Sequence, residues 1–113
     1  MKPDRKIPEN PIEFISRCLD EGKVYWTYHV NMRLASRGIA RNDVLRATTS
    51  LQFVEAYPED KYLPSYLLLA EARPGPYHVL CAADIEGDNV RIVTAYRPDQ
   101  ADWEEDLKKR RTK

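Results

Sequence analysis

The first regular pattern in the chain is a helical one. Asn10 suits the N-cap of a helix, and Pro11 suits its first position, where the missing N–H costs nothing. Gly22 is a residue at which helices end. Between them the apolar positions recur every three or four residues and share one face: Ile12, Ile15, Cys18 and Leu19. We therefore predict an amphipathic helix that begins at Pro11. Residues 1–10, charged and interrupted by prolines, are predicted to be a flexible arm.

A second helical pattern begins near His29. Val30 and Leu34 are apolar, and Gly38 follows as a stop. Polar residues on the same stretch recur every four positions, which places His29, Arg33 and Arg37 on one stripe. A short helix capped by Asn42 or Asp43 comes next and carries Val44, Leu45 and Ala47. The preceding segment, residues 24–28, alternates weakly and is either a short strand or the lead-in to this hairpin.

The middle of the chain has the pattern of strands. Residues 52–57, 65–72, 77–85 and 90–96 are rich in Val, Ile, Leu and Tyr and are separated by Pro, Gly and Asp/Asn breaks. Their short connections predict an antiparallel meander. Pro98 and Asp99 end it, and a short C-terminal helix is predicted from Asp102 to Arg111, with acids first and bases last. The predicted fold is α+β: a four-stranded antiparallel sheet with helices on one face.

The strand register decides which residues face the helices. Pairing residue 85 with 90 and residue 72 with 77 collects the apolar side chains of three strands on one face, because a slip by one residue would exchange the faces. This register puts Cys81 opposite Thr94 and Val79 opposite Tyr96. We therefore expect Tyr66 and Tyr96 in the core, under the helices.

The opposite face of the predicted sheet has an apolar centre and polar ends. At one end Asp84 faces Arg91, the arrangement of an ordinary cross-strand ion pair. At the other end Glu71, His78 and Arg97 fall in one row. That row is either another surface ion pair or a catalytic cluster, in which the carboxylate tunes the imidazole and the guanidinium holds a phosphate.

An uncovered apolar sheet centre would be a large patch for a monomer. The sequence offers three covers: a partner protein, a second copy of the chain in a homodimer, or the predicted C-terminal helix through Trp103 and Leu107.

Composition and charge limit the functions that remain. The chain has 113 residues, enough for one domain, taken as residues 11–113. Eighteen basic and eighteen acidic residues give a net charge of zero, which excludes sequence-blind binding of nucleic acid over the whole surface and leaves room for a local contact. No segment suits a membrane span or a signal peptide, so we expect a cytoplasmic protein that needs no membrane. Cys18 and Cys81 are expected to be buried hydrophobes, and the two histidines alone make no metal site.

Several short motifs in a fixed order resemble a known family. They are His29-x3-Arg33-x3-Arg37-Gly38-Ile39, Asp43-Val44, Tyr57-Pro58, Pro64-Ser65-Tyr66-Leu67, Pro76-Tyr77-His78-Val79, Thr94-Ala95-Tyr96-Arg97-Pro98-Asp99 and Trp103. The set is similar to the bacterial family called domain of unknown function 4258 and spans about residues 25–111. The family in turn resembles the RelE-like toxins, whose fold is a small antiparallel sheet with helices on one face.

The resemblance implies a function that the residue patterns alone do not. Toxins of that fold are endoribonucleases that cut mRNA without a metal or other cofactor, often on the ribosome, and an antitoxin protein neutralises them. Carried onto this sequence, the catalytic candidates are His78, Glu71, Arg97 and His29, and the phosphate-binding candidates are Arg33 and Arg37. The alternative is a non-catalytic module of the same fold that binds a protein or itself.

Overall fold

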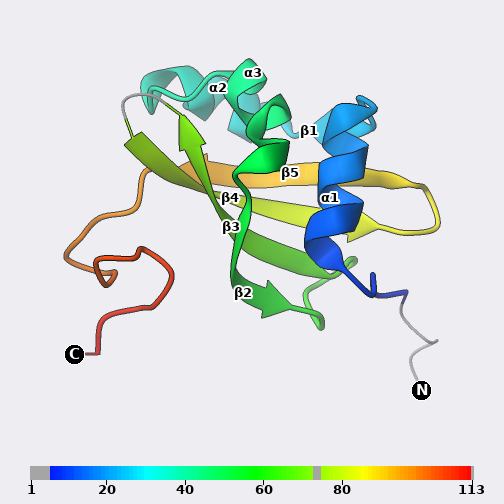
Figure 1. The fold of residues 1–113 in the computed structure, drawn as a ribbon. Helices are drawn as coiled ribbons and strands as arrows, with labels where there is room; N and C mark the ends of the chain where they lie inside the picture. Colours follow the sequence, from blue (N-terminus) through cyan, green and yellow to red (C-terminus); the bar gives the residue numbers. More distant parts are fainter. Residues whose placement is uncertain (1–5, 73–74, 113) are drawn as a thin grey trace.

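The computed structural model describes residues 6–72 and 75–112, and in this part of the chain it has three α-helices and a five-stranded mixed sheet (Figure 1). In chain order the elements are α1 (Pro11–Asp20), β1 (Val24–Trp26), α2 (Tyr28–Ser36), α3 (Arg41–Leu45), the 3-10 turn η1 (Ala47–Thr49), β2 (Gln52–Tyr57), β3 (Ser65–Ala72), β4 (Gly75–Asp84) and β5 (Asn89–Tyr96). The α+β class predicted from the sequence is therefore confirmed.

The sheet has one more strand than the meander predicts. The strand order is β1-β5-β4-β3-β2, with β1 parallel to β5 and every other pair antiparallel. Val24–Trp26 forms β1 because it lies beside Val90–Ile92, with Val24 and Trp26 packed against the core and Tyr25 turned away from it. The prediction of a purely antiparallel, four-stranded sheet is corrected to this extent.

The helices cover one face of the sheet, and local signals in the sequence explain where they begin. The Asn10 side chain accepts a hydrogen bond from the Glu13 N–H, and the Thr27 side chain accepts one from Val30, so both caps satisfy orphan donors. Below the helices lies the main core, whose largest fully buried members include Tyr77, Ile15, Ile39, Leu68 and Ile92. Tyr66, Cys18 and Cys81 are buried there too, as expected.

The observed register differs from the predicted one by two residues in each hairpin. Ala72 pairs with Gly75 and Ala83 pairs with Val90. A shift of two keeps every side chain on its predicted face, because the period of a strand is two. The core residues of β3 and β4 were therefore assigned correctly even though their partners were not.

A β-bulge in β5 does exchange the faces. Cys81 pairs with Ile92 but Leu80 pairs with Thr94, so Val93 is an extra residue opposite β4. Beyond it Tyr96 pairs with His78 on the face away from the helices, and the expectation that Tyr96 belongs to the helix-covered core is wrong.

The C-terminal segment is not the predicted helix. After β5 the described chain makes turns and a single isolated bridge between Trp103 and Arg110. Leu107 has a φ of 60°, a left-handed conformation that interrupts any helix through it. The segment nevertheless covers the sheet centre with Trp103 and Leu107, which are the side chains expected to do so. In Figure 1 it is the orange and red trace at the left of the view.

Two further expectations concern the N-terminal arm and membrane crossing. Of the predicted arm, residues 1–5 lie outside the described residues, and residues 6–10 lead into α1 without forming helix or strand, with Pro8 buried. Among the described helices, none combines the length and apolar character that a membrane crossing requires.

Candidate active site on the open face of the sheet

The sheet face opposite the helices, called the open face below, carries a second apolar cluster and a cavity beside it. The C-terminal segment and the sheet meet in that cluster, formed by Leu67, Leu69, Trp103 and Leu107. The cavity has a volume of about 600 Å³, which lies within the usual range for small-molecule sites. It is lined by Tyr57, Pro58, Glu59, Asp60, Leu67, Leu80, Thr94, Tyr96 and Arg110.

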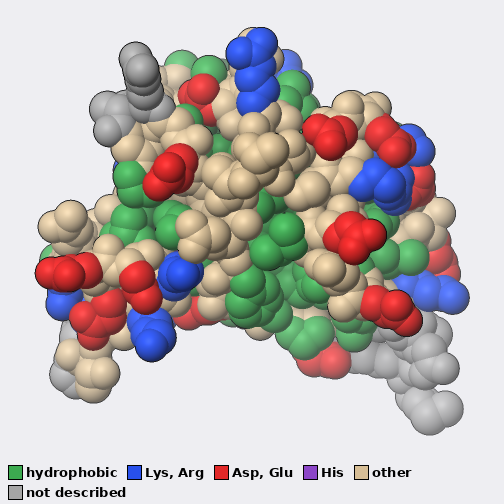
Figure 2. All heavy atoms as spheres, in the orientation of Figure 1, with side chains coloured by type: hydrophobic (Ala, Val, Ile, Leu, Met, Phe, Trp, Pro, Cys, Tyr) green, Lys and Arg blue, Asp and Glu red, His purple; other side chains and the backbone are tan. Residues whose placement is uncertain are grey.

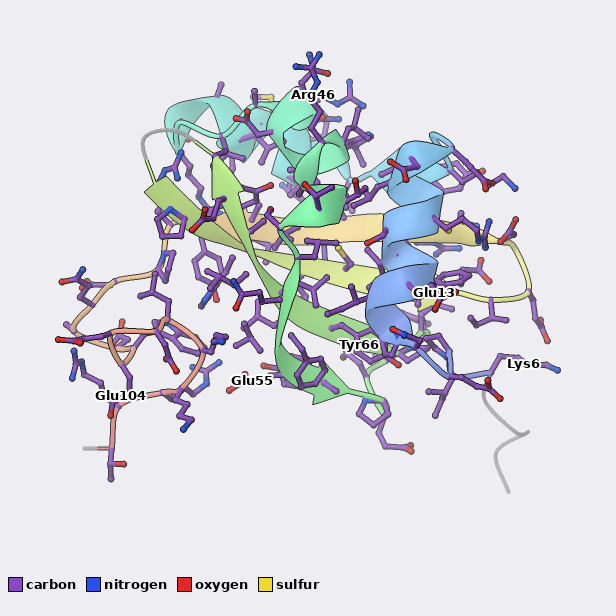
Figure 3. All side chains as sticks on the ribbon, viewed as in Figure 1. Lys6, Glu13, Arg46, Glu55, Tyr66 and Glu104 are labelled. Atoms are coloured by element: carbon purple, nitrogen blue, oxygen red, sulfur yellow. The ribbon has the colours of Figure 1, made fainter. Side chains whose placement is uncertain are left out.

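One side of the cavity is a carboxylate–tyrosine–arginine network. Arg110 binds both oxygens of Glu55, from Nε to Oε2 at 2.9 Å and from a terminal nitrogen to Oε1 at 3.1 Å. The Tyr57 hydroxyl donates to the same Oε1. Figure 3 shows Glu55 on β2, on the side toward the C-terminal segment. A bidentate pair of this kind is geometrically specific, and its strength falls with exposure: Glu55 is mostly covered and Arg110 is not.

The network fixes the protonation of its members. The hydrogen bonds from Arg110 hold the pKa of Glu55 below its ordinary value, and Glu55 in turn raises the pKa of Arg110. Burial, followed by the hydrogen bond to Glu55, raises the pKa of Tyr57. Near neutral pH the group therefore contains a carboxylate, a guanidinium and a protonated phenol.

Tyr96 lines another side of the cavity and is held there by His78. The His78 side chain has no exposed surface. Nε2 lies 2.7 Å from the Leu107 carbonyl oxygen, which can only accept, so Nε2 carries the proton and Nδ1 accepts from the Tyr96 hydroxyl at 3.2 Å. The rings of Tyr96 and Trp103 stand edge-on to the imidazole. His78 thus holds Tyr96 at the cavity and the C-terminal segment on the sheet.

Burial also sets the charge of His78. It lowers the pKa of His78 below the ordinary histidine value, although the hydrogen bond to Leu107 opposes the shift. His78 is therefore neutral near pH 7 and has no direct access to a ligand in the cavity.

The predicted row of Glu71, His78 and Arg97 is not assembled. Glu71 pairs with Pro76 rather than His78, and its side chain is exposed. Arg97 lies beyond the bulge and turns toward the helix layer, where its guanidinium donates to the carbonyl oxygens of Gly38, Ala72, Gly75 and Pro76. These bonds tie the β3–β4 hairpin to the α2–α3 turn.

The predicted stripe on α2 is also divided. His29 is exposed and stands edge-on to the neighbouring Tyr28 ring. Arg33 is exposed on the helix. Arg37 instead donates to the Ala95 carbonyl at 2.7 Å and to Thr94 Oγ1 at 3.4 Å, on the stretch of β5 that β1 does not reach. All three lie on the helix layer, whereas the cavity opens on the other face of the sheet.

A second, polar hollow adjoins the cavity. Its volume is about 540 Å³, and Tyr96 and Arg110 line both spaces. The other residues around it are Arg97, Asp99, Asp102, Trp103 and Arg111. Figure 2 shows acidic and basic side chains intermixed at the lower left, over the C-terminal segment.

Sequence reasoning missed four residues of this site. Tyr96 was placed in the core, Arg110 in a helix, and Glu55 and Tyr57 received no role. The sequence did carry a signal for Tyr57 and Tyr96, because Tyr57-Pro58 and Tyr96-Arg97-Pro98 both belong to the ordered set of motifs that resembles the family. Chemically the arrangement offers a carboxylate base, two phenols whose protons lie on hydrogen bonds to Glu55 and His78, and a guanidinium fork, the groups that handle a phosphodiester.

Within residues 6–72 and 75–112, no three His, Cys, Asp or Glu side chains are grouped so that they could hold a metal ion.

Comparison with known proteins gives a family and no function. The family model described as domain of unknown function (DUF4258) matches residues 26–97. No curated protein and no solved structure matches the chain.

Proposed function

The chain belongs to the DUF4258 family, which has no known function, and from that premise we propose that it is a RelE-like, toxin-type endoribonuclease that cuts mRNA without a metal. The observation that carries the proposal is the cavity on the open face, which is lined by Tyr57, Tyr96 and Arg110, with Glu55 hydrogen-bonded to Tyr57 and Arg110 behind its wall. The proposal also draws on the expectation from the sequence motifs that the family is RelE-like, because the activity of RelE-like toxins resides on the open face of the sheet.

The Glu55–Arg110 pair suggests how substrate would activate the site. A phosphate that binds the Arg110 fork competes with Glu55 for the same N–H groups. When the phosphate replaces Glu55 on Arg110, Glu55 keeps only its hydrogen bond from the Tyr57 hydroxyl. The hydrogen bonds from Arg110, which are the main cause of the low pKa of Glu55, are then lost. Glu55 then becomes a stronger base only when a phosphodiester is in place.

The proposed reaction is an internal transfer at phosphorus. Glu55 removes the proton from a ribose 2′-hydroxyl, and that oxygen attacks the adjacent phosphorus while Arg110 stabilises the charge on the phosphoryl oxygens. The bond from phosphorus to the 5′ oxygen breaks. The Tyr96 hydroxyl rotates its proton from His78 Nδ1 to the leaving oxygen and protonates it. The proton on Glu55 returns to Tyr96 through water. The products are a 2′,3′-cyclic phosphate and a free 5′-hydroxyl.

In this account two of the originally predicted residues act through others. His78 is a positioning residue that orients Tyr96, because its own side chain is fully covered. Arg37 supports the end of β5 from which Tyr96 projects. An antitoxin protein that blocks the open face completes the proposal, and the ribosome is the expected source of the mRNA.

The test uses the purified full-length protein and variants of the network. Wild type is expected to cut mRNA, with ribosomes present, in buffer containing EDTA, and its induced expression is expected to arrest bacterial growth. Arg110→Lys keeps the charge and loses the fork, and Glu55→Gln loses the base; each is expected to reduce cleavage at least 100-fold, within the range of one general-base contribution. Arg91→Ala is the matched control, because it removes another exposed arginine–carboxylate pair.

The rival function is the non-catalytic module. It predicts no cleavage by wild type, normal growth on induction, and a protein partner or a homodimer instead. Cleavage that survives unchanged in both Arg110→Lys and Glu55→Gln would also contradict the proposal, because another site would then be responsible.

A further inference from the structure

The arginines of the helix layer differ from the others in their partners. Elsewhere in the described chain, exposed arginines pair with carboxylates: Arg17, Arg91, Arg110 and Arg111. No arginine within residues 24–50 pairs with a carboxylate of the described residues, and these side chains form what we call the arginine surface: Arg33, Arg37, Arg41 and Arg46. The segment has one acid, Asp43, whose carboxylate accepts the Ala40 N–H at 2.8 Å. Four arginines and one acid give the segment a net charge of +3, in a chain whose net charge is zero.

Contacts along β5 bring three of these arginines to one region. The Arg41 guanidinium lies 4.7 Å from the centre of the Trp26 ring, and Trp26 is the last residue of β1, beside β5. Arg37 donates to the Ala95 carbonyl, further along β5. Arg33 is exposed one helical turn before Arg37, on the same side of α2. The three positive charges therefore lie together beside the C-terminal half of β5.

Exposed apolar surface lies beside these charges. Tyr28, at the start of α2, is 73% exposed, and Met32, one turn later, is 62% exposed. The Tyr28 ring stands edge-on to His29, which lies one turn before Arg33. At the end of α3, Arg46 projects outward from the helix layer (Figure 3). An exposed aromatic ring among guanidiniums is the combination that stacks the bases and holds the phosphates of single-stranded nucleic acid.

The arginine surface meets the cavity at Thr94. Thr94 lines the cavity, and its hydroxyl accepts a hydrogen bond from Arg37 at 3.4 Å. Since β1 pairs with β5 only as far as Ile92, it does not close this edge of the sheet. Both printed bonds of Arg37 come from one terminal nitrogen, and its other N–H groups have no hydrogen-bond partner among the described residues. A chain of nucleotides that leaves the cavity here would therefore meet a guanidinium as it passes to the helix layer.

We propose that the arginine surface is a docking surface for single-stranded RNA, which continues from the cavity past the edge of β5 onto α2. Arg33, Arg37 and Arg41 contact its phosphates, and Tyr28 stacks one of its bases. The inference rests on the proposed function for the source of this RNA. RNA fits better than an acidic protein segment, because the surface borders the cavity that RNA enters and carries a ring on which any base can stack. Such contacts position RNA without reading its sequence.

The test measures binding without cleavage. The full-length protein is titrated into a fluorescent 2′-O-methyl oligouridine of about twelve nucleotides, within the range of site sizes for single strands, and anisotropy is followed at several salt concentrations. The blocked 2′ oxygen of this probe cannot attack phosphorus. Wild type is expected to bind it, with an affinity that falls as the salt concentration rises. The double variant Arg33→Gln/Arg41→Gln is expected to bind more weakly, and its slope of log K against log salt should be smaller by about 0.7 for each arginine.

Two further variants separate stacking from charge. Tyr28→Ala should weaken binding at least about fivefold, the lower end for loss of one stacked base, and should leave the salt slope unchanged. Arg91→Gln is the matched control, because it removes the same charge from an exposed arginine that already pairs with Asp84. It should change neither the affinity nor the slope.

Failure of this inference differs from failure of the proposed function. Equal affinity and slope in wild type and the double variant, or no binding by wild type at low salt, overturns the docking surface whether or not RNA is cut. A polyglutamate chain that binds as tightly as the oligonucleotide overturns RNA as the partner and favours an acidic protein. RNA binding that the double variant loses, in a protein that cuts no RNA, supports the docking surface and overturns the endoribonuclease.

Discussion

At the scale of single residues, burial decides what each titratable side chain can do. His78 combines an imidazole with a neighbouring tyrosine, yet both ring nitrogens are occupied and no part of the side chain is exposed. Glu55 is mostly but not fully covered, and its carboxylate is bonded to Tyr57 and Arg110, which line the cavity. The chemistry thus belongs to the residues around the histidine, and the histidine supports them.

His78 should make stability depend on pH. Burial lowers the pKa of His78 in the folded protein, so the unfolded chain binds the proton more readily. The contribution of neutral His78 to the free energy of unfolding is therefore complete above pH about 6.5, the unfolded pKa. It is lost as the pH falls toward the folded pKa. The free energy of unfolding should therefore decline between pH 7 and pH 5. His78→Gln should remove that decline, measured by urea unfolding at each pH. His29→Gln, at the exposed histidine, should retain it; a decline unchanged in His78→Gln would contradict the assignment.

Asp88 should produce a second pH effect, at lower pH. Its carboxylate forms ion pairs with Arg17 and with Lys23, the second at 2.6 Å, and so connects the β4–β5 turn to the end of α1. The hydrogen bonds from Arg17 and Lys23 lower the pKa of Asp88 to about 2. The contribution is complete above the unfolded value of about 4 and is lost as the pH falls toward 2. The Tm gap between wild type and Asp88→Asn should narrow over that interval. Asp20→Asn, an exposed acid of α1, should show a smaller gap; equal gaps would argue against the cluster.

At the scale of elements, two bulges build the site. The β5 bulge at Val93 turns Tyr96 to the open face and Arg97 toward the helices. The β2 bulge lies between Phe53 and Glu55 and sets Glu55 opposite Leu67, on that same open face. Each bulge is one extra residue in an otherwise regular ladder, and each re-aims the side chains that follow it.

These bulges explain how far sequence reasoning could go. The helices, the strands and the core face follow from periodicity and caps, and an error of two residues in register leaves the faces unchanged. A bulge leaves no trace in an alternating pattern, so Tyr96 and Arg97 were exchanged and the row at His78 was predicted where none exists. The prediction of a C-terminal helix was also wrong. It rested on the order of charges, which suits a helix, but the segment has no apolar stripe to pack a helix on the sheet.

Arg37 binds the part of β5 that β1 leaves unpaired. β1 pairs with β5 only as far as Ile92, and the guanidinium of Arg37 binds the Ala95 carbonyl beyond it. Arg37→Ala should lower the free energy of unfolding by about 1.5–3 kcal/mol, the range for a hydrogen bond to a charged group. Arg33→Ala, one turn earlier and exposed, should change it by less than about 0.5 kcal/mol. If denaturant titrations gave the same loss of unfolding free energy for Arg37→Ala and Arg33→Ala, the proposed role of Arg37 at β5 would be wrong.

At the scale of the whole molecule, the C-terminal segment completes the sheet instead of adding a helix. It covers the open face through Trp103 and Leu107, and Arg110 connects it to Glu55 on the edge strand β2. One segment therefore closes the second apolar cluster and supplies a wall of the cavity.

Removing the anchor of this segment should expose the open face. Trp103 is buried and contacts both the His78 ring and the Arg110 guanidinium, so Trp103→Ala should cost about 3–5 kcal/mol of stability. Dye binding and self-association should rise as the leucines beneath become accessible, measured by ANS fluorescence and size-exclusion chromatography. Tyr62→Ala, at an aromatic side chain that is 80% exposed, is the control and should change neither. Unchanged ANS binding in Trp103→Ala would show that the segment is not a cover.

The central claim, that the open-face cavity cleaves RNA through its 2′-hydroxyl, is tested most directly by the chemistry of the cut ends. One RNA is cut by the wild-type protein in EDTA, and mass spectrometry identifies the termini; the same RNA with a single 2′-deoxy residue before the mapped cut is treated in parallel. The account predicts a 2′,3′-cyclic phosphate and a 5′-hydroxyl, and no cut at the deoxy position. A 5′-phosphate end, cleavage at the deoxy position, or an intact RNA would contradict it.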